Sequence, residues 1–201
     1  MQGKTHISTA AGIGLLSNIL LGGMHMILPT VVFSSLGGIL PDIDMDNSKI
    51  SHLVEVAVGF LFSSLFIGVI LAVSRVTPDF ELEINMDPYV MGPLVLFIVL
   101  ALIGKRTKHR SFMHSLLALF LFTYTIKPFA NGYWIYFMLG YISHLGIDLL
   151  NRKSERLLFP FKFGFRLNLC RSDGVVNNII FMTGIGIICI CSYILVCRKY
   201  F

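Results

Sequence analysis

The residues best suited to chemistry in this chain are carboxylates and imidazoles, which gather in a few short stretches. The first stretch, "GGILPDIDMDNSKISH", has Asp42, Asp44 and Asp46 at alternating positions. Two later stretches, "KHRSFMHS" and "SHLGIDLLN", supply further histidines and an aspartate. Carboxylate oxygens and neutral imidazole nitrogens together suit zinc, manganese or iron. The candidate ligands are His6, Asp42, Asp44, Asp46, His52, His109, His114, His144 and Asp148.

The spacing of these residues favours a shared site. His144 and Asp148 are four residues apart, so on a helix their side chains lie on one face, about 5–6 Å apart. Asp42 and Asp44 follow Pro41, where we expect extended chain, and in extended chain residues two apart point the same way. Each pair can therefore present two ligands to one ion.

His109 and His114 are five residues apart and would not share a helical face. The two imidazoles converge if His109 lies in a loop and His114 lies in the first turn of the next helix. Without Asp46 or His52, or without both, seven or eight candidate ligands remain. This number exceeds the four that a single zinc ion takes, so we expect two or more ions.

Each of these groups also has a purely structural interpretation. Asp46 could cap a helix that begins near residue 48. His114 could be a histidine buried within a helical bundle, and His144 with Asp148 could be a simple hydrogen-bonded pair. Because ionisable groups are costly to bury in a membrane, the set as a whole favours a metal site.

Composition places these groups in a membrane protein. Of the 201 residues, 55% are hydrophobic and 13% are charged, and the mean hydropathy is +0.78. Soluble domains carry about 25% charged residues, and about 20 apolar residues cross a bilayer as a helix. The sequence therefore predicts an all-α fold, a single integral membrane domain over residues 1–201 with five to seven transmembrane helices. The apolar segments are 7–22, 27–40, 53–74, 90–104, 112–127, 132–150 and 178–197.

The charges of the loops predict which side of the membrane each loop faces. Residues 104–111 and 151–177 are rich in lysine and arginine, whereas residues 75–89 are acidic. Basic loops stay in the cytoplasm, so the N-terminus and the candidate ligands are expected at cytoplasmic helix ends, with His25 on the opposite side. Seven crossings would place Arg198 and Lys199 outside, which the same rule disfavours. Orientation also accounts for the net charge of +5, so no nucleic-acid partner is expected.

Five short motifs of the chain together resemble those of a known protein family. "TH" near the N-terminus, "GGILPDIDMD", "KHRSFMHS", "SHLGIDLLN" and "LLFPFKFGFRL" occur in this order. Together they closely resemble the YdjM-like family of bacterial inner-membrane proteins, described as membrane-bound metal-dependent hydrolases, over about residues 4–168. Ser111 departs from many relatives, which have glycine after His-Arg. A link to the SOS repressor LexA is attached to the family name, but none of these residues carries it.

The YdjM-like family is distantly similar to zinc-dependent phospholipase C, and this relation implies a site and a reaction. Zinc is the first expectation for the cofactor, with manganese or iron as alternatives, and more than one ion is expected. The implied ligands are His6, Asp42, Asp44, His109, His114, His144 and Asp148. The bacterial inner membrane, crossed several times, is the implied location.

We expect hydrolysis of a phosphoester in a lipid or lipid-like substrate at the cytoplasmic leaflet. Asp46 or Asp44 would accept a proton from the attacking water, and Arg110 would bind the phosphate through its guanidinium group. The alternative is a non-catalytic membrane protein with a structural metal site that links helix ends and serves a regulatory partner. A metal transporter ranks last, because the helix centres are nearly all apolar.

Overall fold

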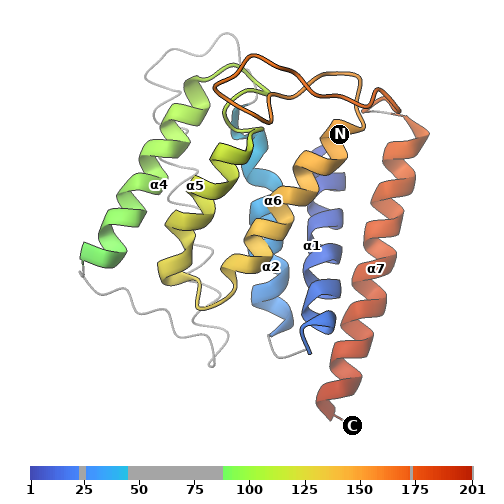
Figure 1. The fold of residues 1–201 in the computed structure, drawn as a ribbon. Coiled ribbons are helices and arrows are strands. Elements are labelled where there is room, and N and C mark those ends of the chain that lie inside the picture. Colours follow the sequence, from blue (N-terminus) through green and yellow to red (C-terminus); the bar gives the residue numbers. More distant parts are fainter. Residues whose placement is uncertain (23–25, 45–87, 173, 201) are drawn as a thin grey trace. The chain divides into compact units, whose positions relative to one another are not determined.

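The computed structural model describes residues 1–22, 26–44, 88–172 and 174–200 (Figure 1). Apart from two isolated β-bridges, regular structure in these ranges is helical, which confirms the all-α prediction for the described part. The predicted segment 53–74, together with His25, Asp46 and His52, lies outside the described residues. The helices are α1 (Gly3–Leu20), α2 (Ile27–Ile39), η1 (Leu40–Asp44), α4 (Pro88–Arg106), α5 (Leu116–Ile126), η2 (Lys127–Phe129), α6 (Trp134–Leu149) and α7 (Val175–Tyr200).

Helix α7 is, among the described helices, the one that is long and apolar enough to cross a membrane. Its apolar stretch, Val175–Arg198, has 24 residues and a mean hydropathy of 2.5. Two shorter apolar stretches, Ile27–Ile43 and Leu116–Phe129, have fewer than the roughly 20 residues that typically span the hydrocarbon core. The predicted number of five to seven transmembrane helices stays a prediction.

The chain forms two compact units, and the first contains both chain ends: Met1–Pro41, Ile135–Glu155 and Gly164–Phe201. Within it, α1 packs against both α2 and α7 (Figure 1). Leu15 of α1 and Cys191 and Leu195 of α7 form a buried apolar cluster. Cys191, which is 3% exposed, serves as a small apolar packing residue in this cluster.

Glycines set the close approach of α2 and α6 in this unit. A Cβ atom at Gly140 would clash with the carbonyl oxygen of Ser34, and one at Gly37 would clash with the carbonyl oxygen of Phe137. Backbones can approach this closely only where no side chain separates them, as is common between membrane helices. The two glycines therefore fix how α6 lies on α2.

The second unit comprises Asp42–Trp134 and Arg156–Phe163. Helix α4 packs against α5, where the rings of Phe97 and Phe122 meet edge to face with centroids 5.3 Å apart. The backbone N–H of Leu116 donates to the carbonyl oxygen of Leu157 at 2.9 Å, which ties the segment 156–163 to the start of α5.

The structure corrects three local predictions. Asp42 and Asp44 lie in the 3-10 helix η1 and not in extended chain. The two-residue repeat of extended chain therefore does not apply here, since a 3-10 helix has about three residues per turn. His6 lies inside α1, because that helix begins at Gly3 and not at residue 7, where the predicted apolar segment starts. His114 precedes α5, because Ser115 caps that helix by accepting the N–H of Ala118 at 3.1 Å.

Candidate metal centre

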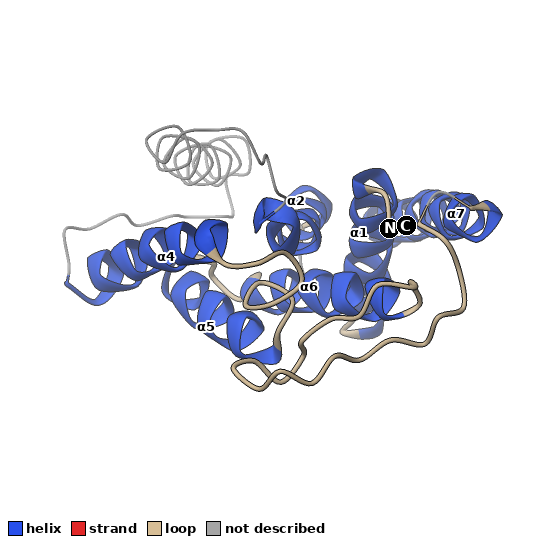
Figure 2. Ribbon diagram, turned by 90° about the horizontal axis from the view of Figure 1, so that it is seen from above, coloured by secondary structure: helices blue, strands red, loops and turns tan. Residues whose placement is uncertain are grey.

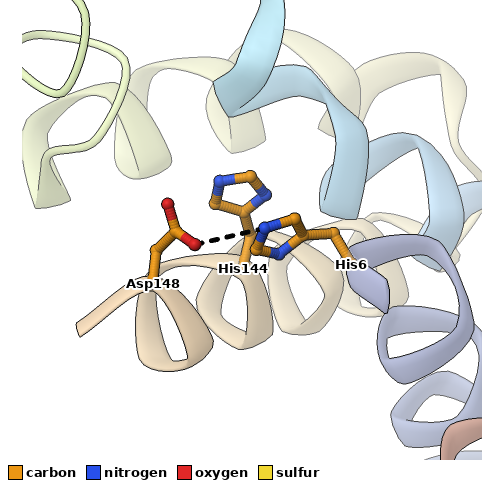
Figure 3. Close-up of side chains that lie close together, drawn as sticks. All are labelled: His6, His144 and Asp148. Carbon is orange, nitrogen blue, oxygen red and sulfur yellow. Dashed lines mark ion pairs between the residues drawn. The ribbon is translucent and has the colours of Figure 1, made fainter. Parts of the chain in front are cut away.

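The first unit brings His6, His144 and Asp148 together (Figure 3). Nε2 of His6 lies 3.2 Å from Oδ1 of Asp148, and the two imidazole rings stack with centroids 3.8 Å apart. Potential ligand atoms of all three side chains lie within 4.8 Å of one another. The prediction that His144 and Asp148 share a face of one helix is confirmed, and α1 adds His6 to that face.

All three side chains are removed from solvent. His6 and His144 are 0% exposed and Asp148 is 1% exposed. Burying a carboxylate and two imidazoles costs free energy unless charge and polarity are compensated. The three side chains therefore need partners that compensate their charge and polarity.

Helix α2 orients the ring of His144. Nδ1 of His144 lies 2.7 Å from the carbonyl oxygen of Gly38. A carbonyl oxygen can only accept, so Nδ1 carries the proton and the lone pair of the neutral ring is on Nε2. Gly38 also lies close to α1, where a Cβ atom would be 3.1 Å from the carbonyl oxygen of His6. One residue of α2 therefore positions the helices that carry both histidines.

Asparagines support this group and were missed by the sequence analysis. Asn151, 2% exposed, donates from Nδ2 to Oδ1 of Asp148 at 2.8 Å, and the amino nitrogen of Met1 contacts the same oxygen. Asn177 of α7 accepts the hydroxyl of Thr5 at 2.9 Å and so holds the first turn of α1. The sequence signal for Asn151 is its spacing of three from Asp148; Asn177 has no local signal, since its partners are more than 170 residues away.

The donor set of this cluster fits a divalent ion. Two imidazoles and one carboxylate match catalytic zinc sites, in which three protein ligands leave a fourth position to water or substrate. The hydrogen bond from Nδ1 of His144 to a carbonyl is the usual support for a histidine that coordinates through its other nitrogen. Nδ1 of His6 is buried and has no hydrogen-bond partner within the described ranges.

The second unit gathers a different group: Asp42, His109 and His114. Nε2 of His114 lies 4.0 Å from Oδ1 of Asp42, and the rings of His109 and His114 meet edge to face with centroids 5.2 Å apart. The predicted convergence of the two histidines is confirmed, although both lie in the loop before α5. His114 is fully buried, whereas the Asp42 side chain is 20% exposed.

Arg110, the predicted phosphate ligand, lies between these histidines in an unusual backbone conformation. Its φ of 64° is in the left-handed region, which residues other than glycine rarely adopt. Hydrogen bonds fix the turn: the N–H of Ser111 donates to the carbonyl of Lys108 at 3.0 Å, and the carbonyl of Arg110 accepts from Arg156 at 3.1 Å. Such strain concentrates at functional positions.

The described part of the chain is helical and has a long apolar helix and a buried cluster of two histidines and one aspartate, which defines the class of helical membrane proteins with candidate metal sites. The family profile of the YdjM inner membrane protein matches residues 1–200. The chain belongs to this family, which confirms the resemblance seen in the motifs. Comparison with curated proteins finds no match, and comparison with solved structures finds none.

Proposed function

We propose that this inner-membrane protein is a metal-dependent hydrolase that crosses the membrane several times, with its N-terminus in the cytoplasm. Its substrate class is a phosphoester in a lipid or lipid-like molecule, cleaved at the cytoplasmic leaflet. The basic loops 104–111 and 151–177 support this orientation.

The observation that carries the proposal is the hydrogen bond between Nδ1 of His144 and the carbonyl of Gly38. A histidine that serves only as packing needs no fixed tautomer. Here the carbonyl fixes the tautomer that directs the Nε2 lone pair away from α2, in a cluster with His6 and Asp148. This is the arrangement of a ligand oriented by its outer partner.

Each residue then has a chemical role. A bound zinc ion, or manganese or iron, would lower the pKa of a coordinated water towards neutrality and polarise a phosphoryl oxygen. His6, His144 and Asp148 would hold one ion, and Asp42, His109 and His114 supply the donors for another, with Asp44 as a further ligand. The guanidinium of Arg110 would pair with phosphate oxygens. Asp46, or Asp44 where it is not a ligand, would accept the proton of the attacking water.

A non-catalytic site that fastens helix ends is the second candidate. Its support is the burial of His6, His144 and Asp148, since none is more than 1% exposed. Structural zinc sites are closed by protein ligands, and such burial is typical of them.

Detergent-purified protein tests both candidates. We expect at least one tightly bound divalent ion by elemental analysis and hydrolysis of at least one phosphoester in a panel of lipid substrates. Asp148→Asn should remove metal and activity together, whereas Ser154→Ala, at an exposed position, should retain both. Metal bound without hydrolysis of any substrate would favour the fastening site, and unchanged metal content in Asp148→Asn would refute the ligand role.

A further inference from the structure

The chain between α6 and α7 exposes large apolar side chains on a backbone that is not helical. The segment 151–172 is drawn as loop along its length in Figure 2. In its part that belongs to unit 1, Phe165 is 41% exposed, Leu167 59% and Leu169 71%. Outside the segment 151–172, the exposed large apolar side chains of the described ranges lie on helices or, in the case of Leu21, directly at a helix end.

In a membrane protein, an exposed apolar side chain on a helix and one on an irregular backbone lie in different surroundings. Apolar side chains on a helix can face lipid tails, because the helix satisfies its own backbone. Irregular backbone does not occur in contact with the hydrocarbon core. Phe165, Leu167 and Leu169 therefore belong either in water, where each costs free energy, or at the interface between water and lipid.

This exposure is built into an anchored backbone. The N–H groups of Phe165, Leu167 and Leu169 donate to the carbonyls of Glu155, Leu149 and Leu150 at 2.8, 2.7 and 2.9 Å. The segment thus runs along the end of α6 with fixed hydrogen bonds. Side chains held outward by such a backbone present a defined surface.

The exposed charged side chains of this surface are all positive. Arg166 and Arg171 are exposed, and Arg166 also donates to the carbonyl of Arg152 at 3.1 Å. Glu155, the acidic residue among the described residues 151–172, is fully buried. The preceding residues of the chain repeat this composition, since Phe161, Lys162 and Phe163 are all exposed. Arginine between apolar side chains complements an interface that carries anionic phosphate groups.

The position of this segment in the chain, just before α7, is consistent with a location at the membrane interface. Arg171 precedes Val175, the first residue of α7, by four residues, which span at most about 14 Å of chain. Because α7 is long and apolar enough to cross a membrane, this segment lies close to where the membrane would begin.

We propose that residues 164–171 form a lipid-binding surface that inserts Phe165, Leu167 and Leu169 into the interface and binds anionic phospholipid headgroups through Arg166 and Arg171. The proposal concerns lipid binding and stands whether or not the protein is a hydrolase. The occupant is the membrane surface and not a protein partner, because cations and large apolar groups are exposed together on one short anchored segment.

Titration of the full-length protein in detergent with fluorescently labelled phosphatidylglycerol and phosphatidylcholine tests the charges. We expect tighter binding of phosphatidylglycerol, and about a fivefold loss of that affinity for each charge removed in Arg166→Gln and Arg171→Gln. Arg198→Gln, at the exposed opposite end of α7, is the matched control and should bind as the wild type does. Equal affinity for both lipids, or equal losses in all three variants, would overturn the proposal.

Hydrogen–deuterium exchange of the wild-type protein tests the surface without a variant. Residues 164–171 should exchange more slowly in nanodiscs that contain phosphatidylglycerol than in nanodiscs of phosphatidylcholine alone. Exchange that is the same in both bilayers, or that slows only when a protein partner is added, would contradict the lipid assignment.

Discussion

The two groups of predicted ligands differ in what holds them. His6, His144 and Asp148 project from helices α1 and α6, are at most 1% exposed and lie within hydrogen-bonding or stacking contact. Asp42 and His114 project from a 3-10 helix and a loop, at 4.0 Å from each other, with Asp42 partly exposed. Helices joined through glycine contacts fix ligand positions closely, whereas loop ligands retain freedom to adjust.

The difference between the two groups suggests that they have different roles in metal binding. Under the proposed function, the helix-borne group would retain an ion, because packed helices hold its members in place. The loop-borne group, next to Arg110 in the sequence, would exchange ligands when a substrate binds. Variants that loosen one group and leave the other intact can separate these roles.

The largest effect is expected at the contact of α2 with α6. Gly140→Ala places a Cβ against the carbonyl of Ser34, so α6 must move away from α2. The free energy of unfolding should fall by about 1–3 kcal/mol, and bound metal should fall with it because Gly38 moves relative to His144. Thermal unfolding followed by the fluorescence of Trp134, together with elemental analysis, measures both.

Gly146→Ala is the matched control for this contact. A Cβ at Gly146, on the same helix, meets nothing within 4 Å. This variant should be neutral or stabilised by up to about 1 kcal/mol, since alanine favours a helix over glycine. Equal destabilisation by the two variants would show that the crossing of α2 and α6 does not depend on the missing side chain.

The next effect separates the two ligand groups directly. His144→Ala should remove the ion of the helix-borne group, and His114→Ala should weaken an ion in the loop-borne group while leaving the first in place. Elemental analysis under increasing chelator concentration should therefore show a larger loss for His144→Ala. The reverse order would mean that the loop-borne group is the tighter site.

A smaller effect is expected from the support of Asp148. Asn151→Ala removes the amide that donates to Oδ1 at 2.8 Å but leaves all ligands present. Outer partners of this kind contribute about 10–100-fold to metal affinity. Competition with a chromogenic chelator should show a loss in this range; Asn178→Ala, at an exposed position of α7, should cause none.

What the sequence could predict was local. The spacing of His144 and Asp148 determines their shared face once a helix forms, and the apolar runs located the described helices. The extended chain predicted at Asp42 and Asp44 was wrong, because Pro41 is accepted in the first turn of a 3-10 helix as readily as in extended chain. The roles of Gly38, Asn151 and Asn177 depend on contacts between distant segments, and spacing alone carries no information about them.

At Arg110, the stability of the turn and the proposed binding of phosphate favour different residues. At a φ of 64° the backbone alone would favour glycine over arginine by about 1 kcal/mol. Under the proposed function, the chain accepts a less stable turn and keeps at this position an arginine whose guanidinium group would bind phosphate. A protein in which glycine replaced Arg110 would relax its turn and lose its cation, so folding and ligand capture would change in opposite directions at a single position.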